Sequence, residues 1–311
     1  MKHLIFILIL FPLSIDGQTI YLKSYGSDSD PIVIFIHGGP GGNSTLFEST
    51  TANILSEKGF FVIVYDRRGE GRSLDENATF TFDEASNDLN MIYEKYKIKK
   101  ANLIAHSFGG IVATLYTNKY IEKVESIVLV DALFSQQETY DHILDASEKI
   151  FKNKKDTLML NKVIEIRKLS KNSPEYRAMC YEIADSNHFF NMPKPTEEYM
   201  KLMNEYKESD LYKDNIRNKN STRLFFKNEP LNNIDIKNIL IMIRNNNVPL
   251  YAVYGKQDGI FSRKQLNDLK EIVGKKQFTL IDNCSHYSFV DQQCLFLKNI
   301  IFALKNVRNV R

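Results

Sequence analysis

The sequence predicts an α/β protein with a doubly wound, mostly parallel sheet and an inserted helical cap. Three observations predict this fold class. Continuous apolar runs, which suit strands buried on both faces of a parallel sheet, alternate with amphipathic helix patterns. The alternation stops over residues 134–247, where the chain is rich in lysine, asparagine and glutamate. Apolar runs then return at 248–254 and 277–281, so the middle segment interrupts a single sheet.

The first elements follow one another closely. Thr19–Ser24 predicts a short strand, and Pro31–His37 (P-I-V-I-F-I-H) predicts a strand buried on both faces. Thr45-x-x-Glu48 has the pattern of a capping box, which predicts a helix that begins there and runs to about residue 58. Phe60–Tyr65 predicts the next buried strand.

A second capping box, Thr81-x-x-Glu84, predicts the start of another helix. The apolar residues of this helix fall on one face, at Ala85, Leu89, Ile92, Tyr93 and Tyr96. A strand over 101–106, a helix and a strand over 126–130 follow. Beyond the middle segment, the last strand is followed by an amphipathic helix over about 291–304.

The N-terminus has the pattern of a secretory signal peptide over residues 1–17. Lys2 precedes the apolar run Leu4–Leu13, which is about half as long as the ~20 residues of a membrane span. A secreted or periplasmic protein is therefore expected, with no stable membrane insertion after cleavage. Ile15 fits the small-residue rule of the cleavage site poorly, so an uncleaved anchor is the alternative. The predicted organisation is then core over 18–133, helical cap over 134–247 and core over 248–311.

Composition bounds the partners of the protein. The 311 residues carry a net charge of +3, too small to indicate nucleic acid as a partner, so a small-molecule or short-peptide substrate is expected. There are three cysteines, of which Cys284 and Cys294 could pair, although three free thiols are the preferred interpretation. No zinc-ligand spacing appears, and no metal or organic cofactor is implied. The oligomeric state stays open.

The stretch from residue 102 to 110, N-L-I-A-H-S-F-G-G, predicts a nucleophile elbow. An apolar run ends in a serine and two glycines, and a helical pattern follows at once. The tight turn lifts Ser107 to the end of the sheet, and it requires small residues two positions before and after the serine. Ala105 and Gly109 occupy these positions, and alanine in place of the usual glycine adds only a methyl group.

A serine hydroxyl needs a base, and the base needs a group that orients it. His286 and Asp258 each follow a predicted strand, at the edge where open α/β sheets place their ligands. We therefore expect Ser107, His286 and Asp258 to converge as a catalytic triad. Asp131, which also follows a strand, is the rival acid.

The reaction also needs donors for the oxyanion that develops on the substrate. Behind a nucleophile elbow, one donor is the backbone N–H of the next residue, here Phe108. The loop after the 31–37 strand, which reads H-G-G-P-G-G, predicts the other. We expect the backbone N–H of Gly39 to be this donor, with that of Gly38 as the alternative, because glycine lets the backbone approach a substrate closely.

With these motifs the chain resembles the α/β-hydrolase superfamily, and within it the proline iminopeptidase-like serine peptidases. H-G-G-P-G-G (37–42) is similar to that family's oxyanion loop, and D-R-R-G-E-G-R-S (66–73) to its D-x-R-G-x-G-x-S segment. The elbow departs from the family pattern G-G-S-W-G. The resemblance implies cap glutamates that hold the free amine of a peptide. Our candidates for this role are Glu182 and Asp185, with Glu197 and Glu198 as further ones.

Three functions follow as hypotheses. The first is a secreted serine hydrolase that removes N-terminal residues, proline first, from short peptides through an acyl-enzyme. The second is the same chemistry on esters or lactones, which requires an apolar cap pocket instead of buried carboxylates. The third is a binding module that has lost catalysis, against which the three triad residues argue.

Overall fold

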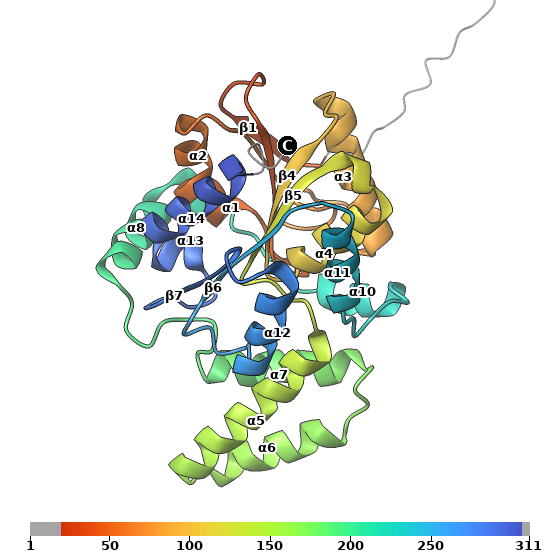
Figure 1. Ribbon diagram of the computed structural model, residues 1–311. Coiled ribbons are helices and arrows are strands. Elements are labelled where there is room, and N and C mark those ends of the chain that lie inside the picture. The colour runs from red at the N-terminus through yellow and green to blue at the C-terminus, as the bar shows by residue number, and fades with distance from the viewer. Residues whose placement is uncertain (1–19, 307–311) are drawn as a thin grey trace, which may run out of the picture.

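The computed structural model describes residues 20–306. A single sheet runs through its centre (Figure 1). The sheet has seven strands in the order β1-β3-β2-β4-β5-β6-β7. The strands are β1 (Leu22–Tyr25), β2 (Ile32–Ile36), β3 (Phe61–Tyr65), β4 (Ala101–His106), β5 (Val124–Val130), β6 (Leu250–Gly255) and β7 (Phe278–Ile281). Of the neighbouring pairs in this sheet, β1–β3 is antiparallel and the others are parallel. The predicted doubly wound, mostly parallel sheet is confirmed.

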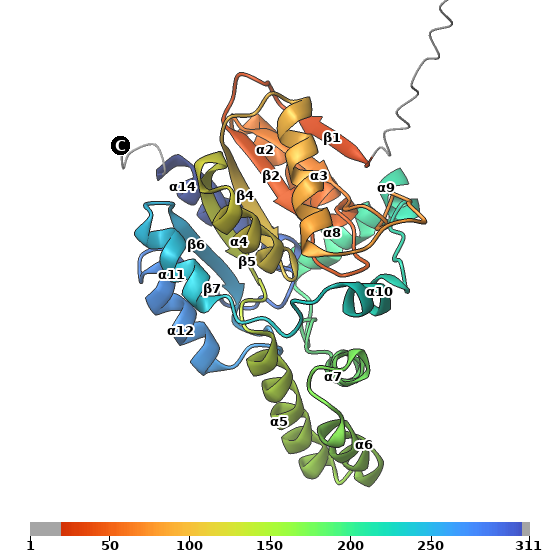
Figure 2. The ribbon, with the colours of Figure 1, turned by 90° about the vertical axis from the view of Figure 1, so that its right-hand side faces the viewer.

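Helices cover both faces of this sheet (Figures 1 and 2). In chain order, the helices of residues 20–306 are α1 (Thr45–Phe47), α2 (Asn53–Glu57), α3 (Phe82–Lys95), α4 (Gly109–Lys119), α5 (Gln136–Lys154), α6 (Thr157–Lys168), α7 (Pro174–Ser186), α8 (Glu197–Glu208), α9 (Asp210–Lys213), α10 (Ser221–Asn228), α11 (Lys237–Asn245), α12 (Arg263–Val273), α13 (Ser288–Asp291) and α14 (Gln293–Asn306). A π-helical turn, η1 (Glu48–Ala52), joins α1 to α2, and a 3₁₀ turn, η2 (Ile121–Lys123), precedes β5.

Alternate strand residues divide into two cores, as the period of two in a strand requires. In β4, Leu103 packs in the core shared with α3, α4, α11 and α12, whereas Ile104 packs in the core shared with α1, α2, α13 and α14. Both side chains are fully buried. The strands therefore read as continuous apolar runs because each face is covered by its own layer of helices.

The first predicted capping box is wrong, and the second is right in part. Helix α1 begins after Ser44, whose side chain makes no capping bond, and the Glu48 carboxylate is buried and bonds Tyr21 and Arg72 instead. A charged partner elsewhere in the fold thus outcompetes the local cap. At α3, Thr81 does accept a hydrogen bond from the Glu84 N–H, as predicted.

The inserted segment between β5 and β6 is helical, as expected, but only part of it projects from the sheet. Helices α5, α6 and α7 form the separate lobe at the bottom of Figures 1 and 2. Helix α8 packs against η1 and α13, and α11 packs against α4 and α12. These two helices belong to the layers of the core, so the projecting cap is smaller than residues 134–247.

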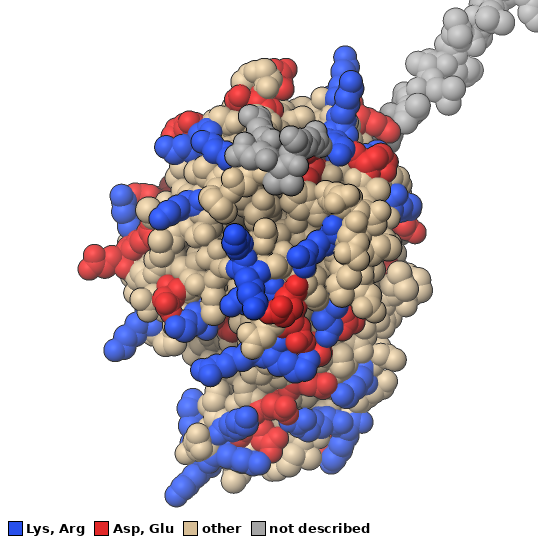
Figure 3. All heavy atoms as spheres, in the orientation of Figure 1, with Lys and Arg blue, Asp and Glu red and all other residues tan. Residues whose placement is uncertain are grey.

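The predicted signal peptide, residues 1–17, lies outside the described residues. Between residues 20 and 306, no helix combines the length and apolar character that crossing a membrane requires. Cys180, Cys284 and Cys294 are all free, so the preferred interpretation of three thiols agrees with the structure. Acidic and basic side chains are interspersed over the face shown in Figure 3, on the cap as well as on the core.

Candidate active site

Ser107 lies in the sharp turn between β4 and α4. Its φ of +53° is in the left-handed region that L-residues other than glycine seldom adopt. The turn is held by the Ser107 N–H, which donates to Val130 O, and by the Ser107 carbonyl, which accepts from Leu133 N. A Cβ on Gly109 would stand 2.4 Å from Ile36 O, so the turn has no room for a larger residue there. This geometry has the form expected of a nucleophile elbow.

The structure brings Ser107, His286 and Asp258 into one hydrogen-bonded row. His286 Nε2 lies 3.0 Å from Ser107 Oγ, and His286 Nδ1 lies 2.7 Å from Asp258 Oδ2. The carboxylate can only accept, so Nδ1 carries the proton and Nε2 is free to accept from the serine hydroxyl. Burial lowers the pKa of His286, but the charge of Asp258 and its hydrogen bond outweigh burial and raise that pKa above its ordinary value.

The rival acid, Asp131, occupies a different place in this cluster. It is fully buried at the end of β5, and its two oxygens accept from Gly255 N at 2.7 Å and from Ser288 N at 3.3 Å. Burial and the nearby charge of Asp258 raise the pKa of Asp131. Asp131 therefore ties β5 to the loops that carry Asp258 and His286, and it is Asp258 that bonds the imidazole.

The two predicted oxyanion donors flank Ser107. Phe108 precedes the first residue of α4, so its N–H is among the amides at a helix start that have no partner within the helix. On the other side, a Cβ on Gly38 would come within 3.1 Å of Ser107 Cβ. The peptide unit between Gly38 and Gly39, whose N–H is the predicted donor, thus lies beside the serine.

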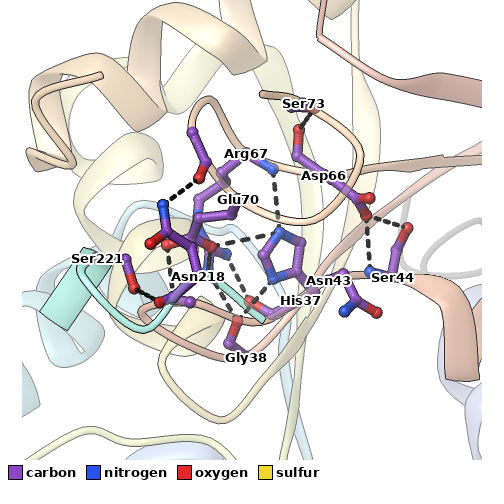
Figure 4. Close-up of polar contacts among 12 residues, drawn as sticks. His37, Gly38, Asn43, Ser44, Asp66, Arg67, Glu70, Ser73, Asn218 and Ser221 are labelled. Atoms are coloured by element: carbon purple, nitrogen blue, oxygen red, sulfur yellow. Dashed lines mark hydrogen bonds and ion pairs between the residues drawn. The ribbon is translucent and has the colours of Figure 1, made fainter. Parts of the chain in front are cut away.

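A buried arginine holds this loop in place. Arg67 donates from Nη1 to His37 O at 2.6 Å and from Nη2 to Gly38 O at 2.8 Å (Figure 4). Glu70 accepts from Arg67 Nη2 at 2.7 Å and from Gly41 N at 3.0 Å, which fixes the arginine and the far end of the loop together. Because C=O and N–H of a trans peptide point in opposite directions, anchoring Gly38 O directs the Gly39 N–H away from Arg67.

Sequence reasoning missed Arg67 and Glu70. They occupy the first and second variable positions of the D-x-R-G-x-G-x-S segment. The loop atoms that they bond, on His37, Gly38 and Gly41, are about 30 residues away in the sequence. The sequence did contain a signal for this pair. Two opposite charges close after a fully buried strand predict a buried ion pair, because charged side chains are seldom buried without a partner.

The cap reaches the site through aromatic residues. Phe190 packs its ring 5.3 Å from that of His286, and Phe189 O accepts from Gly259 N beside Asp258. The stretch 185–190 therefore does lie over the site, as the resemblance implied. Its predicted carboxylates do not join the site: Asp185 is exposed, and Glu182 is exposed and pairs with Lys162 on α6.

The other two cap candidates are also directed elsewhere. Glu197 is exposed, and Glu198 accepts from Cys294 N at the start of α14. Glu197 thus faces outward and the half-buried Glu198 faces the start of α14, and the weak sequence pattern could not distinguish these directions from one toward the site. Within residues 20–306, no group of three or more His, Cys, Asp or Glu side chains is arranged to hold a metal ion.

Replacing Arg67 with glutamine is expected to lower kcat by about 10- to 100-fold with a smaller change in KM. Gly38 O would lose the guanidinium and keep only its contact with His37 Nδ1 at 2.6 Å, and removal of an oxyanion donor outright costs about 10²–10³ in kcat. Arg244→Gln is the matched control, because Arg244 also donates to two backbone carbonyls, those of Glu271 and Ile272, far from the serine. Equal kinetic effects of both variants would contradict the role of Arg67.

Comparison with known proteins shows that the chain is similar to proteins of the α/β-hydrolase fold. The model of the alpha/beta hydrolase fold matches residues 31–293. A proline iminopeptidase of Arabidopsis thaliana is 29% identical over 119 residues, which cover 37% of this chain and 30% of the relative. A bifunctional esterase/perhydrolase of Acinetobacter calcoaceticus is 31% identical over 119 residues, which cover 38% of this chain and 42% of the relative. The match thus spans less than half the length of either relative.

A solved structure extends the similarity over nearly the whole chain. The proline iminopeptidase-related protein of Thermus thermophilus superposes with a TM-score of 0.68 at 22% identity, covering 93% of this chain and 94% of the other. At this identity the similarity shows the fold alone. Because it covers 93% of the chain, the superposition includes most of the inserted segment.

Proposed function

The chain belongs to the α/β-hydrolase family, and from this premise we propose that it is a serine hydrolase that works through an acyl-enzyme. The observation that carries the proposal is the row in which His286 bonds both Ser107 and Asp258. An oriented imidazole beside a hydroxyl at the end of a strained turn is the arrangement that activates a serine.

In the proposed reaction, Ser107 Oγ attacks the carbonyl carbon of the substrate while its proton passes to His286 Nε2. The oxygen that becomes negative is held by the N–H groups of Phe108 and Gly39. His286 then gives the proton to the leaving group, and the acyl group remains on Ser107. A water molecule, deprotonated by the same imidazole, attacks the acyl carbon, and the imidazolium returns that proton to Ser107 Oγ as the acid product leaves. Asp258 stabilises the imidazolium in both halves.

The first candidate substrate is a short peptide from which the N-terminal residue, proline first, is removed. Support comes from the H-G-G-P-G-G loop and from the proline iminopeptidases among the relatives. Export by the segment 1–17 is part of this proposal. Esters are the second candidate, because aromatic residues of the cap, and not its predicted carboxylates, contact the site, and because an esterase is also among the relatives.

A direct comparison of two chromogenic substrates tests these candidates. We expect the wild-type protein to release 4-nitroaniline from prolyl-4-nitroanilide and to turn it over more efficiently than alanyl-4-nitroanilide. Turnover of 4-nitrophenyl butyrate without turnover of either anilide would select the second candidate. If neither the anilides nor the ester is cleaved, both substrate proposals are wrong.

A further inference from the structure

We propose that the cap binds a carboxylate of the substrate through Arg177, assisted by the hydroxyl of Tyr140. The inference rests on the proposed hydrolase function and names the chemistry that its substrate must present. The required carboxylate can come from two sources: the C-terminus of a short peptide, or an acid group carried by one half of an ester. A free amine cannot take its place at Arg177.

The first observation is a buried cation without a counter-ion among the described residues. Arg177, on α7, is fully buried, yet its Nε and Nη1 atoms have no hydrogen-bond partner there. Its Nη2 donates to the side-chain oxygen of Asn232 at 3.1 Å, and its guanidinium lies 4.4 Å from the ring centre of Phe226. An arginine keeps its charge in proteins, and a buried charge without a partner is costly.

The groups around Arg177 do not supply the missing charge. Burial lowers the pKa of Arg177, and the side chains that act most strongly on it in the other direction are Tyr140, Tyr181 and Cys180 rather than a carboxylate. Tyr140, on the neighbouring helix α5, is itself buried. Its hydroxyl lies near that of Tyr181, which acts on the pKa of Tyr140, but it makes no well-aligned hydrogen bond within residues 20–306. Guanidinium N–H groups only donate and a hydroxyl can donate, so this cluster offers donors to an anion.

The second observation is where Arg177 lies relative to Ser107. Two rows of aromatic rings start on either side of the serine. One runs from Phe108 to Phe225 at 5.2 Å and on to Phe226 at 5.1 Å, the ring under the guanidinium. Two phenylalanine rings therefore connect Phe108, the residue of the expected oxyanion donor, to Arg177.

The other row starts at His286. It passes to Phe190 at 5.3 Å and on to Tyr181 at 6.1 Å. Tyr181 follows Arg177 by four residues on α7, so the two side chains share one face of the helix. The Arg177 guanidinium therefore lies at the cap end of both rows of rings, over Phe226 in the first and beside Tyr181 in the second. A substrate that is bound at Ser107 and extends into the cap would meet the guanidinium once the cap side chains separate.

The predicted amine site is not found on α7, because Glu182 and Asp185 lie on the exposed side of that helix. The cation at Arg177 would favour the carboxylate end of a short peptide over its free amine. Because the donors are enclosed, an anion reaches them when the cap side chains separate, as lids do around substrates. The carboxylate then supplies the negative charge that no described residue of the cap brings to Arg177.

Matched substrates that differ by one charge test the proposal. The peptide pair is prolyl-alanine and prolyl-alanine amide, and the ester pair is mono-4-nitrophenyl glutarate and its methyl ester. The wild-type protein is expected to turn over at least one of these pairs. Within such a pair, we expect kcat/KM for the charged member to be about 10- to 100-fold higher than for the neutral one, which is the effect of one charge-assisted hydrogen bond. The pair that shows the preference identifies the source of the carboxylate.

Arg177→Met should reduce this ratio to near one by lowering kcat/KM for the charged member more than for the neutral one. Arg167→Met, which removes an exposed guanidinium from α6 of the same cap, should keep the ratio. A wild-type ratio of one or less, or a ratio that survives in Arg177→Met, would overturn the carboxylate site even though hydrolysis itself continues.

Binding can be measured without turnover, which separates this proposal from the proposed function. Glutarate should raise the melting temperature of the wild-type protein and of Ser107→Ala, and it should not raise that of Arg177→Met. The unliganded Arg177→Met variant should melt above the wild type, because an unpaired buried charge has been removed. Equal shifts in all three proteins, or none in any, would overturn the site whether or not the protein proves to be a hydrolase.

Discussion

Replacing Ser107 with alanine is expected to lower kcat by about 10⁴- to 10⁶-fold, the range found when a serine nucleophile is removed from a triad. The remaining donors and the bound substrate would support only a small residual rate. The measurement is turnover of the substrate that the wild-type protein accepts best, with thermal unfolding followed on the same samples.

Ser107→Gly provides a matched variant with a second readout. The φ of +53° at this position is strained for serine and permitted for glycine. The glycine variant should therefore be as inactive as the alanine variant but more stable by about 1 kcal/mol. A glycine variant that is less stable than the wild type would show that the turn does not carry this strain, and an alanine variant with near-normal kcat would exclude Ser107 as the nucleophile.

Replacing Asp258 with asparagine is expected to lower kcat by about 10⁴-fold, because the imidazole loses the group that fixes its tautomer and stabilises its charged form. The pH dependence should move as well. In the wild type, Asp258 offsets the effect of burial and raises the pKa of His286, so we expect activity to be lost as the pH falls through that pKa. Removing the negative charge lowers the pKa, so the residual activity of the variant should persist to lower pH.

Asp131→Asn is the control for this experiment, since both carboxylates are buried in one cluster and only one bonds the imidazole. The asparagine side chain would keep the acceptor for one backbone N–H and lose the other, so a moderate loss of stability and a much smaller loss of kcat are expected. A harmless Asp258→Asn beside a severe Asp131→Asn would show that our account assigns the acid wrongly.

Most of the fold could be predicted from local sequence patterns, because these patterns depend only on which residues are buried. The runs Ile32–Ile36 and Phe61–Tyr65 are strands with helices over both faces, and such strands admit few polar residues. The Ser107 turn could be predicted for the same reason, since the contact of Gly109 with Ile36 O demands a glycine. Helix α12 was missed although Ser262 and Gln265 form a complete capping box there, a signal that the sequence does contain.

The remaining features depend on partners that are distant in sequence. Glu48 looked like a local cap, but in the fold it meets Arg72 and Tyr21. Arg67 stands beside the His37 loop only because β2 and β3 are neighbours in the sheet. The direction in which a cap side chain points, as for Glu182 or Arg177, depends on how short helices pack together, which one weakly amphipathic sequence does not specify.

The central claim is that Ser107 is a nucleophile made reactive by His286. A fluorophosphonate probe tests it most directly, because the probe bonds covalently to an activated serine and its position can be read by peptide mass spectrometry. The account predicts one labelled peptide containing Ser107 in the wild-type protein and loss of that label in His286→Ala. A folded wild-type protein that takes no label, or takes it at another serine, would contradict the account.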